Sequence, residues 1–297
     1  MNSSTIRVTE IPVSFAKYYI VIPVTVGCAV IAITVACFIL ILIISKKNLH
    51  TITHMLICNT CVSSILFCII QCNNYVHLGF ILWNTSNLSC QWRAYLAYMS
   101  IASVVYSYLV QAISRYFFSI LSRKYCWLLT FKTHIILIVT HWLIVIIIPI
   151  SVFIRKDVVF RPFSLCWIPR RSLYHSAYIY LACYILPIAF IIALYIYIYA
   201  RIKRRKTILS AIIMVVRQNR DVEVLRNMMI LLGIYIAGGA PTVFYFVSEI
   251  KLFYTMGVIS ISLAVVIEKV MTIFIDREIR LIIKQCLPCR KTHVVPM

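Results

Sequence analysis

The chain is poor in acidic residues and in glycine. Eight Asp and Glu residues stand against 29 Lys and Arg residues in a chain of 297, which gives a formal net charge of +21. With six glycines, the sequence contains no glycine-rich phosphate loop, and it shows no metal-ligand cluster and no nucleophile–base set. These absences argue against an enzyme, and we expect neither a metal nor a cofactor.

Apolar residues are abundant, because they make up 63% of the chain and the mean hydropathy is +0.96. Soluble domains contain about 45–50% apolar residues, so this composition is typical of a membrane protein. In a soluble protein a charge of +21 would suggest a nucleic-acid partner. Here most basic residues lie in short loops between apolar runs, where positive charge is kept on the cytoplasmic side. We therefore expect the lipid bilayer, and no nucleic acid, as a partner.

Seven apolar segments predict an all-α membrane protein, a seven-transmembrane helix bundle with a short amphipathic C-terminal helix. The seven-transmembrane domain would cover residues 18–276, after an extracellular N-terminus at 1–17. Residues 277–297 would form the amphipathic helix and a cytoplasmic tail. Residues 207–216 are apolar but too short to span, so we expect an extension of the fifth helix or a membrane-surface helix. The segments run over about 18–44, 53–72, 90–118, 134–154, 174–200, 224–247 and 252–275.

The basic loops predict the orientation of the chain. Lys and Arg follow the first, third, fifth and seventh segments, which assigns that side to the cytoplasm and the N-terminus to the outside. The outer loop between the fourth and fifth segments is also basic, so the bias is not clean. Three glycosylation acceptor patterns, at Asn2, Asn84 and Asn87, all fall outside under this topology. We expect a multi-pass protein of the plasma membrane.

A set of residues at the ends and in the middle of the segments resembles a known family. Cys90 opens the third segment, and Arg115 lies 25 residues later, in the sequence Ser114-Arg115-Tyr116. In order and spacing the set resembles the rhodopsin-like (class A) G protein-coupled receptors, over nearly the whole chain. The set consists of Trp83, Cys90, Arg115, Trp142, Pro187, Tyr195 and Pro241.

The resemblance implies a receptor that couples an unknown extracellular ligand to a heterotrimeric G protein. Ser114, Arg115 and Tyr116 would lie at the coupling end, although the family usually has an acidic residue where Ser114 stands. We therefore expect Asp221, at the start of the sixth helix, to pair with Arg115 at rest and to leave it when that helix swings outward. Tyr195 would then turn toward Arg115. The alternative is an arginine that reaches to lipid phosphates.

Cysteine usage adds two expectations. Most of the twelve cysteines lie inside apolar runs, where they pack as small hydrophobes, but Cys90 and Cys166 lie at the ends of segments. The resemblance implies a disulfide between these two on the oxidising outer side, and the alternative is two free thiols. Cys286 and Cys289 follow the amphipathic segment and are candidates for palmitoylation.

The resemblance also implies a ligand pocket open to the outside. Ala97 stands where amine receptors carry an acidic residue, which argues against an amine ligand. The remaining positions describe an apolar cavity with a few polar groups. The basic outer loop would attract an acidic peptide or another anion, unless it binds lipid headgroups or is simply solvated. The expected lining residues are Tyr98, Ile101, Cys183, Thr242, Phe246 and Ser262.

Several residues depart from the family pattern. The seventh segment has Glu268 and Lys269 where the family carries its Asn-Pro-x-x-Tyr motif, and Ser64 and Gly239 replace an aspartate and an aromatic residue. Glu268 facing Ser64 would restore a central carboxylate, unless the span ends earlier and both charges lie near the cytoplasmic headgroups. These departures favour, as an alternative, a receptor-like protein without G protein signalling. A transporter or channel would need polar residues along several spans, and these spans are mostly apolar.

Overall fold

The computed structural model is helical apart from short turns and connecting segments, and it has no strand in the part of the chain that it describes. Seven of these helices are long and apolar enough to cross a membrane, so the predicted seven-helix fold is confirmed and the chain is a multi-pass membrane protein. The described residues are 15–80, 86–122, 125–158, 160, 165–169, 172–208, 212–248 and 251–286. Within them, the side chains of 15–19, 79–80, 202–208, 212–225, 246–247, 251 and 284–286 fall outside the description.

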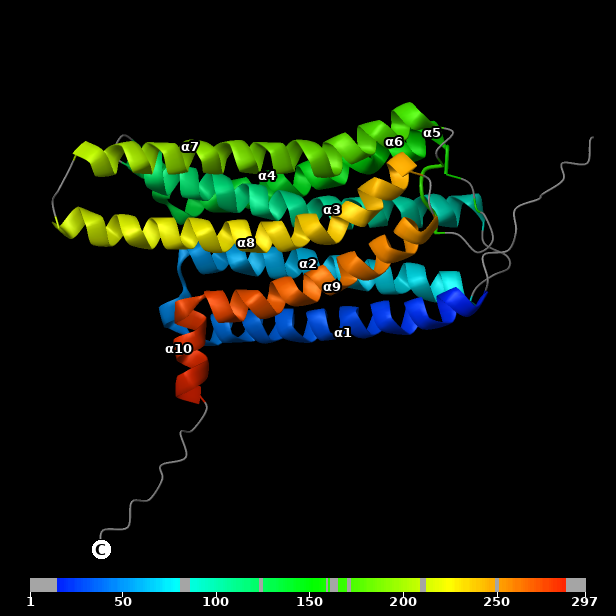
Figure 1. Cartoon of the computed structure of the whole chain (residues 1–297), viewed down its shortest axis with the longest axis horizontal. Coiled ribbons are helices and arrows are strands. Elements are labelled where there is room, and N and C mark those ends of the chain that lie inside the picture. The colour runs from blue at the N-terminus through cyan, green and yellow to red at the C-terminus, as the bar shows by residue number, and fades with distance from the viewer. Residues whose placement is uncertain are drawn as a thin grey trace, which may run out of the picture.

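The spans lie side by side along one axis, and the short last helix runs across it (Figure 1). Two spans consist of more than one element: α4 continues through a 3-10 turn at Ile148–Ile150 into α5, and α6 continues through a π turn at Leu181–Ile185 into α7. The helices are α1 (Phe15–Ser45), α2 (Ile52–Phe80), α3 (Asn87–Tyr116), α4 (Phe131–Ile147), α5 (Ser151–Arg155), α6 (Leu173–Tyr180), α7 (Leu186–Ile208), α8 (Ile212–Ser248), α9 (Lys251–Ile275) and α10 (Arg277–Cys286).

The two ends of the bundle are named here by what they carry. The disulfide end holds the start of α3, where Cys90 is bonded to Cys166. The α10 end holds the end of α3 and the turn from α9 into α10. The disulfide that the resemblance implied is therefore present.

Proline explains the interruption of the fifth span. Pro187 has no backbone N–H, so it cannot donate to the carbonyl of Cys183, one turn earlier. The chain forms the π turn Leu181–Ile185 directly before this proline. In the fourth span, Pro149 lies within the 3-10 turn, whereas Pro241 lies inside an unbroken α8.

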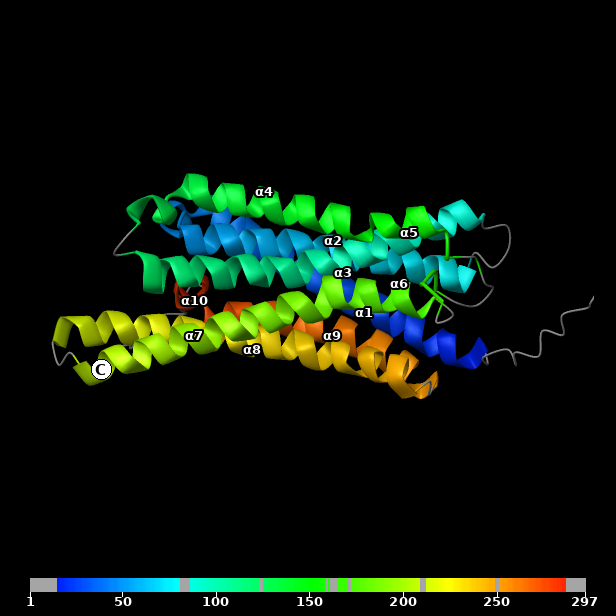
Figure 2. The same cartoon turned by 90° about the horizontal axis from the view of Figure 1, so that it is seen from above.

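Helix α3 is the central helix of the bundle. Of its most apolar window 67% is buried, against 22% for the fourth span and 28% for the sixth. In both overall views α3 lies between α2 and α7 (Figures 1 and 2). Small residues let its neighbours approach closely, because they hold the backbones near one another. Those that are buried include Ala94, Ala97, Ser100, Ser103 and Ser107.

Helices α8 and α9 approach each other through glycine. A Cβ atom added at Gly238 would lie 2.3 Å from the Cβ of Ala264, and one at Gly257 would lie 2.5 Å from Oγ1 of Thr242. At Gly239, the position where the family has an aromatic residue, the Tyr184 hydroxyl of the π turn fills the space, 2.3 Å from an added Cβ. Helices α8 and α9 can therefore pack this closely only because Gly238 and Gly257 have no side chains.

Two sequence-based boundaries are wrong. Helix α2 continues to Phe80, beyond the expected end at 72, because polar residues in its last turns, such as Asn74, face the interior instead of ending the helix. Residues 207–216 do not form one segment. Thr207 and Ile208 end α7 as the predicted extension, but 212–216 open α8 and so belong to the sixth helix.

Candidate functional site

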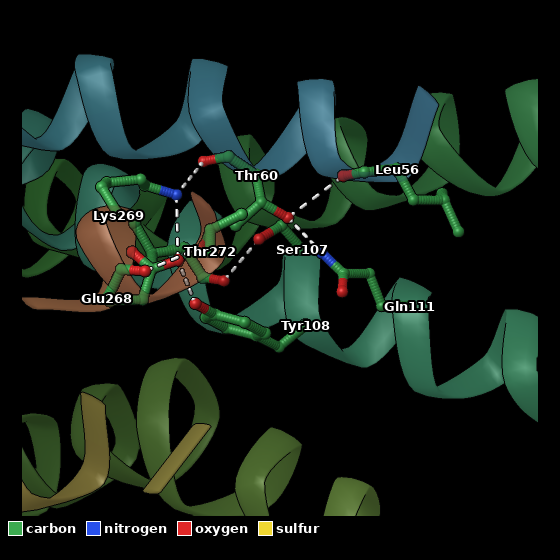
Figure 3. A network of polar contacts seen from close by, with 9 residues as sticks. Leu56, Thr60, Ser107, Tyr108, Gln111, Glu268, Lys269 and Thr272 are labelled. Carbon is green, nitrogen blue, oxygen red and sulfur yellow. Dashed lines mark hydrogen bonds and ion pairs between the residues drawn. The ribbon is translucent and has the colours of Figure 1, made fainter. Parts of the chain in front are cut away.

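The interior of the bundle contains a buried ion pair. Glu268 and Lys269 lie on α9, each is 1% exposed, and Lys269 Nζ is 3.0 Å from Glu268 Oε1. Adjacent residues on a helix do not face each other, so this contact depends on how the long lysine side chain is held. Lys269 Nζ also donates to the Thr60 carbonyl of α2 at 3.5 Å (Figure 3). The pair therefore forms against a second helix.

Helix α3 completes this polar network. The Tyr108 hydroxyl donates to Glu268 Oε1, and Gln111 Nε2 donates to the Thr60 hydroxyl, which in turn donates to the Leu56 carbonyl at 3.1 Å (Figure 3). Three helices thus share one set of buried hydrogen bonds. Glu268 Oε2 is buried and has no hydrogen-bond partner within the described part of the chain. Together with Tyr108, Thr60, Gln111 and Lys269, Glu268 forms what we call the central network.

The central network favours a few defined positions of the helices relative to one another over a gradual sliding movement. A buried charge is costly unless it is paired, so sliding α9 past α2 or α3 must exchange these bonds for others. The ring of Tyr235 on α8 lies 6.4 Å from that of Tyr108, which brings the sixth span against the same network. The arrangement can therefore couple movements of α2, α3, α8 and α9 to one another through the buried ion pair.

Glu268 is buried within the bundle, but its partners differ from the predicted one. The hydroxyl of Ser64 is buried without a hydrogen-bond partner among the described residues, so Glu268 does not bond to it. The span does not end before these residues, because it continues to Ile275, and both side chains are buried. Lys269 is the partner that the sequence-based hypothesis had not assigned.

Arg115 lies at the α10 end of α3 and is half-buried. Its Nη2 donates to the Thr53 hydroxyl of α2 at 3.1 Å. The side chain of Asp221 lies outside the described residues, so the pair with Arg115 stays a prediction. Tyr195 on α7 is buried in the apolar core, and the ring of Tyr116 lies 6.0 Å from that of Tyr197.

Ser114 contacts the fourth span instead of Arg115. Its hydroxyl is 2.9 Å from Nε2 of His134, and Nδ1 of the same ring is 2.9 Å from the Thr130 carbonyl. A carbonyl can only accept, so Nδ1 carries a proton and donates to the Thr130 carbonyl, while Nε2 and the Ser114 hydroxyl share the second hydrogen bond. Ser114 and His134 are both buried, so this contact ties α3 to α4 where the family has an acidic residue.

The other family anchors serve as packing contacts. Trp142 Nε1 donates to Oδ1 of Asn59 at 3.0 Å, which joins α4 to α2. Trp83, Asn2, Asn84 and Cys289 lie outside the described residues. Cys286 is the last residue of α10, and its side chain also lies outside them. Asn87 begins α3, where its Oδ1 accepts a hydrogen bond from the Phe160 backbone at 3.0 Å.

The residues expected to line the ligand pocket pack against, or hydrogen-bond to, other parts of the bundle. Tyr98 and Cys183 are buried in one apolar cluster, and the Tyr98 hydroxyl accepts from the backbone N–H of Ile168 at 3.1 Å. Ile101 packs against a second cluster. Thr242 lies against Gly257, Ser262 donates to the Val258 carbonyl at 3.0 Å, and the side chain of Phe246 is outside the description. A small cavity, with room for about one water molecule, lies elsewhere, between α1, α2 and α9, with Val21, Tyr75 and Tyr254 in its lining.

Sequence reasoning missed a contact at the α10 end. Asp276 Oδ1 accepts from the first backbone N–H groups of α10, at 2.9 and 3.0 Å, and its Oδ2 lies 3.6 Å from His54 Nε2. Burial favours the neutral carboxyl, but the contact with His54 and these N–H groups outweigh it and hold the pKa of Asp276 below its usual value. An aspartate directly before an amphipathic segment is an N-cap signal that would have indicated this role.

A second missed cluster lies at the disulfide end. His175 Nδ1 is 3.1 Å from Asp157 Oδ2, and its Nε2 is 3.1 Å from the hydroxyl of Ser151. The ring of His175 is buried, so the contacts hold α5, the chain that follows it and α6 together. Residues 24 positions apart on separate helices carry no common sequence signal.

Comparison with known proteins adds no family assignment. No family model matches the chain, and a search of curated proteins finds no match. The site is therefore interpreted from its own geometry.

Proposed function

We propose that this chain is a receptor of the rhodopsin-like G protein-coupled class. It would lie in the plasma membrane with its N-terminus outside, and it would pass a signal from an extracellular ligand to a heterotrimeric G protein. The observation that carries the proposal is the continuity of α3. This helix is held by the Cys90 disulfide at one end, bonds to the central network through Tyr108, and carries Arg115 in its last turn.

Signalling across a bilayer needs an element with two discrete arrangements that both ends can bias. The central network supplies the discreteness, because the bonds to Glu268 and Lys269 are buried and cannot be stretched gradually without leaving a charge unpaired. A ligand that shifts α3 or α9 at the disulfide end would change those bonds. The consequence would reach Arg115, which lies two turns of α3 beyond Tyr108.

One observation favours the second candidate, a receptor-like protein without G protein signalling. Ser114 binds His134 rather than Arg115, so the end of α3 is fastened to α4 by a buried contact. A fastened end would oppose the movement that coupling needs. The two candidates share a fold and differ only in whether the chain activates a G protein.

The experiment measures the exchange of GDP for GTP on the G protein in cells that express the wild type, Arg115→Ala or Arg201→Ala. Arg201 is an exposed arginine of α7 at the same end and serves as the matched control. Expression is normalised by a tag at the surface, and each G protein class is tested separately. We expect exchange above mock-transfected cells for wild type and Arg201→Ala, and none for Arg115→Ala. Exchange at the mock level for wild type in every class would favour the second candidate.

A further inference from the structure

Arg93 is a buried cation at the disulfide end, one turn after Cys90 on α3. It is 9% exposed, and its Nε donates to the Ser89 carbonyl at 3.4 Å. Its Nη2 is buried and has no hydrogen-bond partner within the described part of the chain. A guanidinium carries five N–H donors, and the two on Nη2 are buried and unused among the described residues.

A second unsatisfied group lies on the neighbouring helix α2. His77, near the end of α2, has its Nδ1 buried without a hydrogen-bond partner among the residues that the structure describes. The two side chains are close enough to interact electrostatically. Helices α2 and α3, which carry the imidazole and the guanidinium, pack against each other.

The described carboxylates do not compensate this charge. Asp157 is held by His175 and Glu268 by Lys269, while Asp276 and Glu278 lie near His54 at the start of α10, at the other end of the bundle. A cation buried inside a membrane helix bundle is costly unless an anion pairs with it. The protein pays this cost in a chain with a net charge of +21, at the end where the proposed receptor would meet its ligand.

We infer that Arg93, with His77, binds an oxyanion, the carboxylate or phosphate group of a small ligand. The inference deepens the proposed function and rests on it, because it names the class of ligand that the receptor would recognise. The planar guanidinium presents two parallel N–H groups, which match the two oxygens of a carboxylate. His77 would add a third donor from α2, so a bound anion would bridge α2 and α3 beside the disulfide.

The test measures the melting temperature of the full chain in an uncharged detergent. Sodium propionate and sodium phosphate are each compared with sodium chloride at equal ionic strength, because a ligand that binds the folded state raises the melting temperature. The variants are Arg93→Gln, Arg93→Lys and the control Arg155→Gln, which changes an exposed arginine of α5 at the same end. Arg93→Lys keeps the positive charge but loses the two parallel N–H groups of the guanidinium, so it reports on the site even if Arg93→Gln fails to fold.

We expect propionate or phosphate to raise the melting temperature of wild type and Arg155→Gln above the value in chloride. The shift should vanish in Arg93→Gln and shrink in Arg93→Lys. Whichever salt acts identifies the group, carboxylate or phosphate. In chloride alone Arg93→Gln should melt higher than wild type, because it removes an unpaired buried charge. No shift in wild type, or an equal shift in Arg93→Gln or Arg93→Lys, would overturn the inference.

This outcome is separable from that of the proposed function. The melting experiment contains no G protein, so an anion-dependent shift that Arg93 controls would stand even if nucleotide exchange were absent. Conversely, exchange that depends on Arg115 with no anion-dependent shift would leave the receptor without this ligand site.

Discussion

Replacing Lys269 by methionine tests the central network directly. The change removes the ammonium group and keeps an unbranched apolar side chain of similar length. Glu268 then keeps the hydrogen bond from Tyr108 but loses its only ion-pair partner in the described structure, 3.0 Å away. A carboxylate that is 1% exposed cannot exchange that partner for water. We expect Lys269→Met to destabilise the folded bundle strongly.

The magnitude follows from the cost of an orphaned buried charge. Removing one partner of a buried pair costs about 3–5 kcal/mol. For a chain somewhat larger than 250 residues, each kcal/mol lowers the melting temperature by about 2 °C. The melting temperature of Lys269→Met should therefore be about 6–10 °C below that of the wild type.

The assay is thermal unfolding of the purified chain in a neutral detergent. Lys132→Met is the matched control, because Lys132 is an exposed lysine of α4. The double variant Glu268→Gln/Lys269→Met removes both charges and should melt higher than Lys269→Met alone, which would measure the coupling within the pair. The reasoning is refuted if Lys269→Met melts within about 1 °C of Lys132→Met, a difference worth less than about 0.5 kcal/mol.

Two further changes test the packing of the bundle and the docking of its last helix. Gly238→Ala would place a Cβ 2.3 Å from that of Ala264, so thermal unfolding should show a loss of about 1–3 kcal/mol in the free energy of unfolding. The control Gly27→Ala has open space around it and should change that free energy little. Equal effects of the two changes would contradict the close approach of α8 and α9. Asp276→Asn should speed amide hydrogen exchange at the start of α10, because the lowered pKa of Asp276 means that its charged form stabilises the fold. Wild type should lose that contribution only as the pH falls below about 4. A Glu278→Gln control that accelerates exchange as much would contradict the cap.

The number of spans was predictable because hydropathy is a property of contiguous residues. Each of the seven apolar segments corresponds to a membrane-length helix or helix pair, and the polar turns between them are local signals as well. Boundaries were less predictable. Helix α2 extends past its apolar stretch because Asn74 faces the interior, and a linear pattern does not say which way a polar side chain points.

The central network was predictable only in part. An ionisable residue within a span indicates a buried functional position, which drew attention to Glu268. Its hydrogen bond to Tyr108 joins residues 160 positions apart, so the partner depends on how α3 and α9 pack. The contact of Ser114 with His134 has the same origin, since it joins two helices whose spacing no local pattern encodes.

The most direct measurement of the central claim uses the purified chain in lipid nanodiscs with purified heterotrimeric G protein. The rate of GTP uptake by the G protein is compared for wild type, Arg115→Ala and empty nanodiscs. A receptor of the proposed class accelerates uptake above the empty nanodisc, and the acceleration is lost in Arg115→Ala. Uptake by wild type at the rate of empty nanodiscs, for every G protein class, would contradict it.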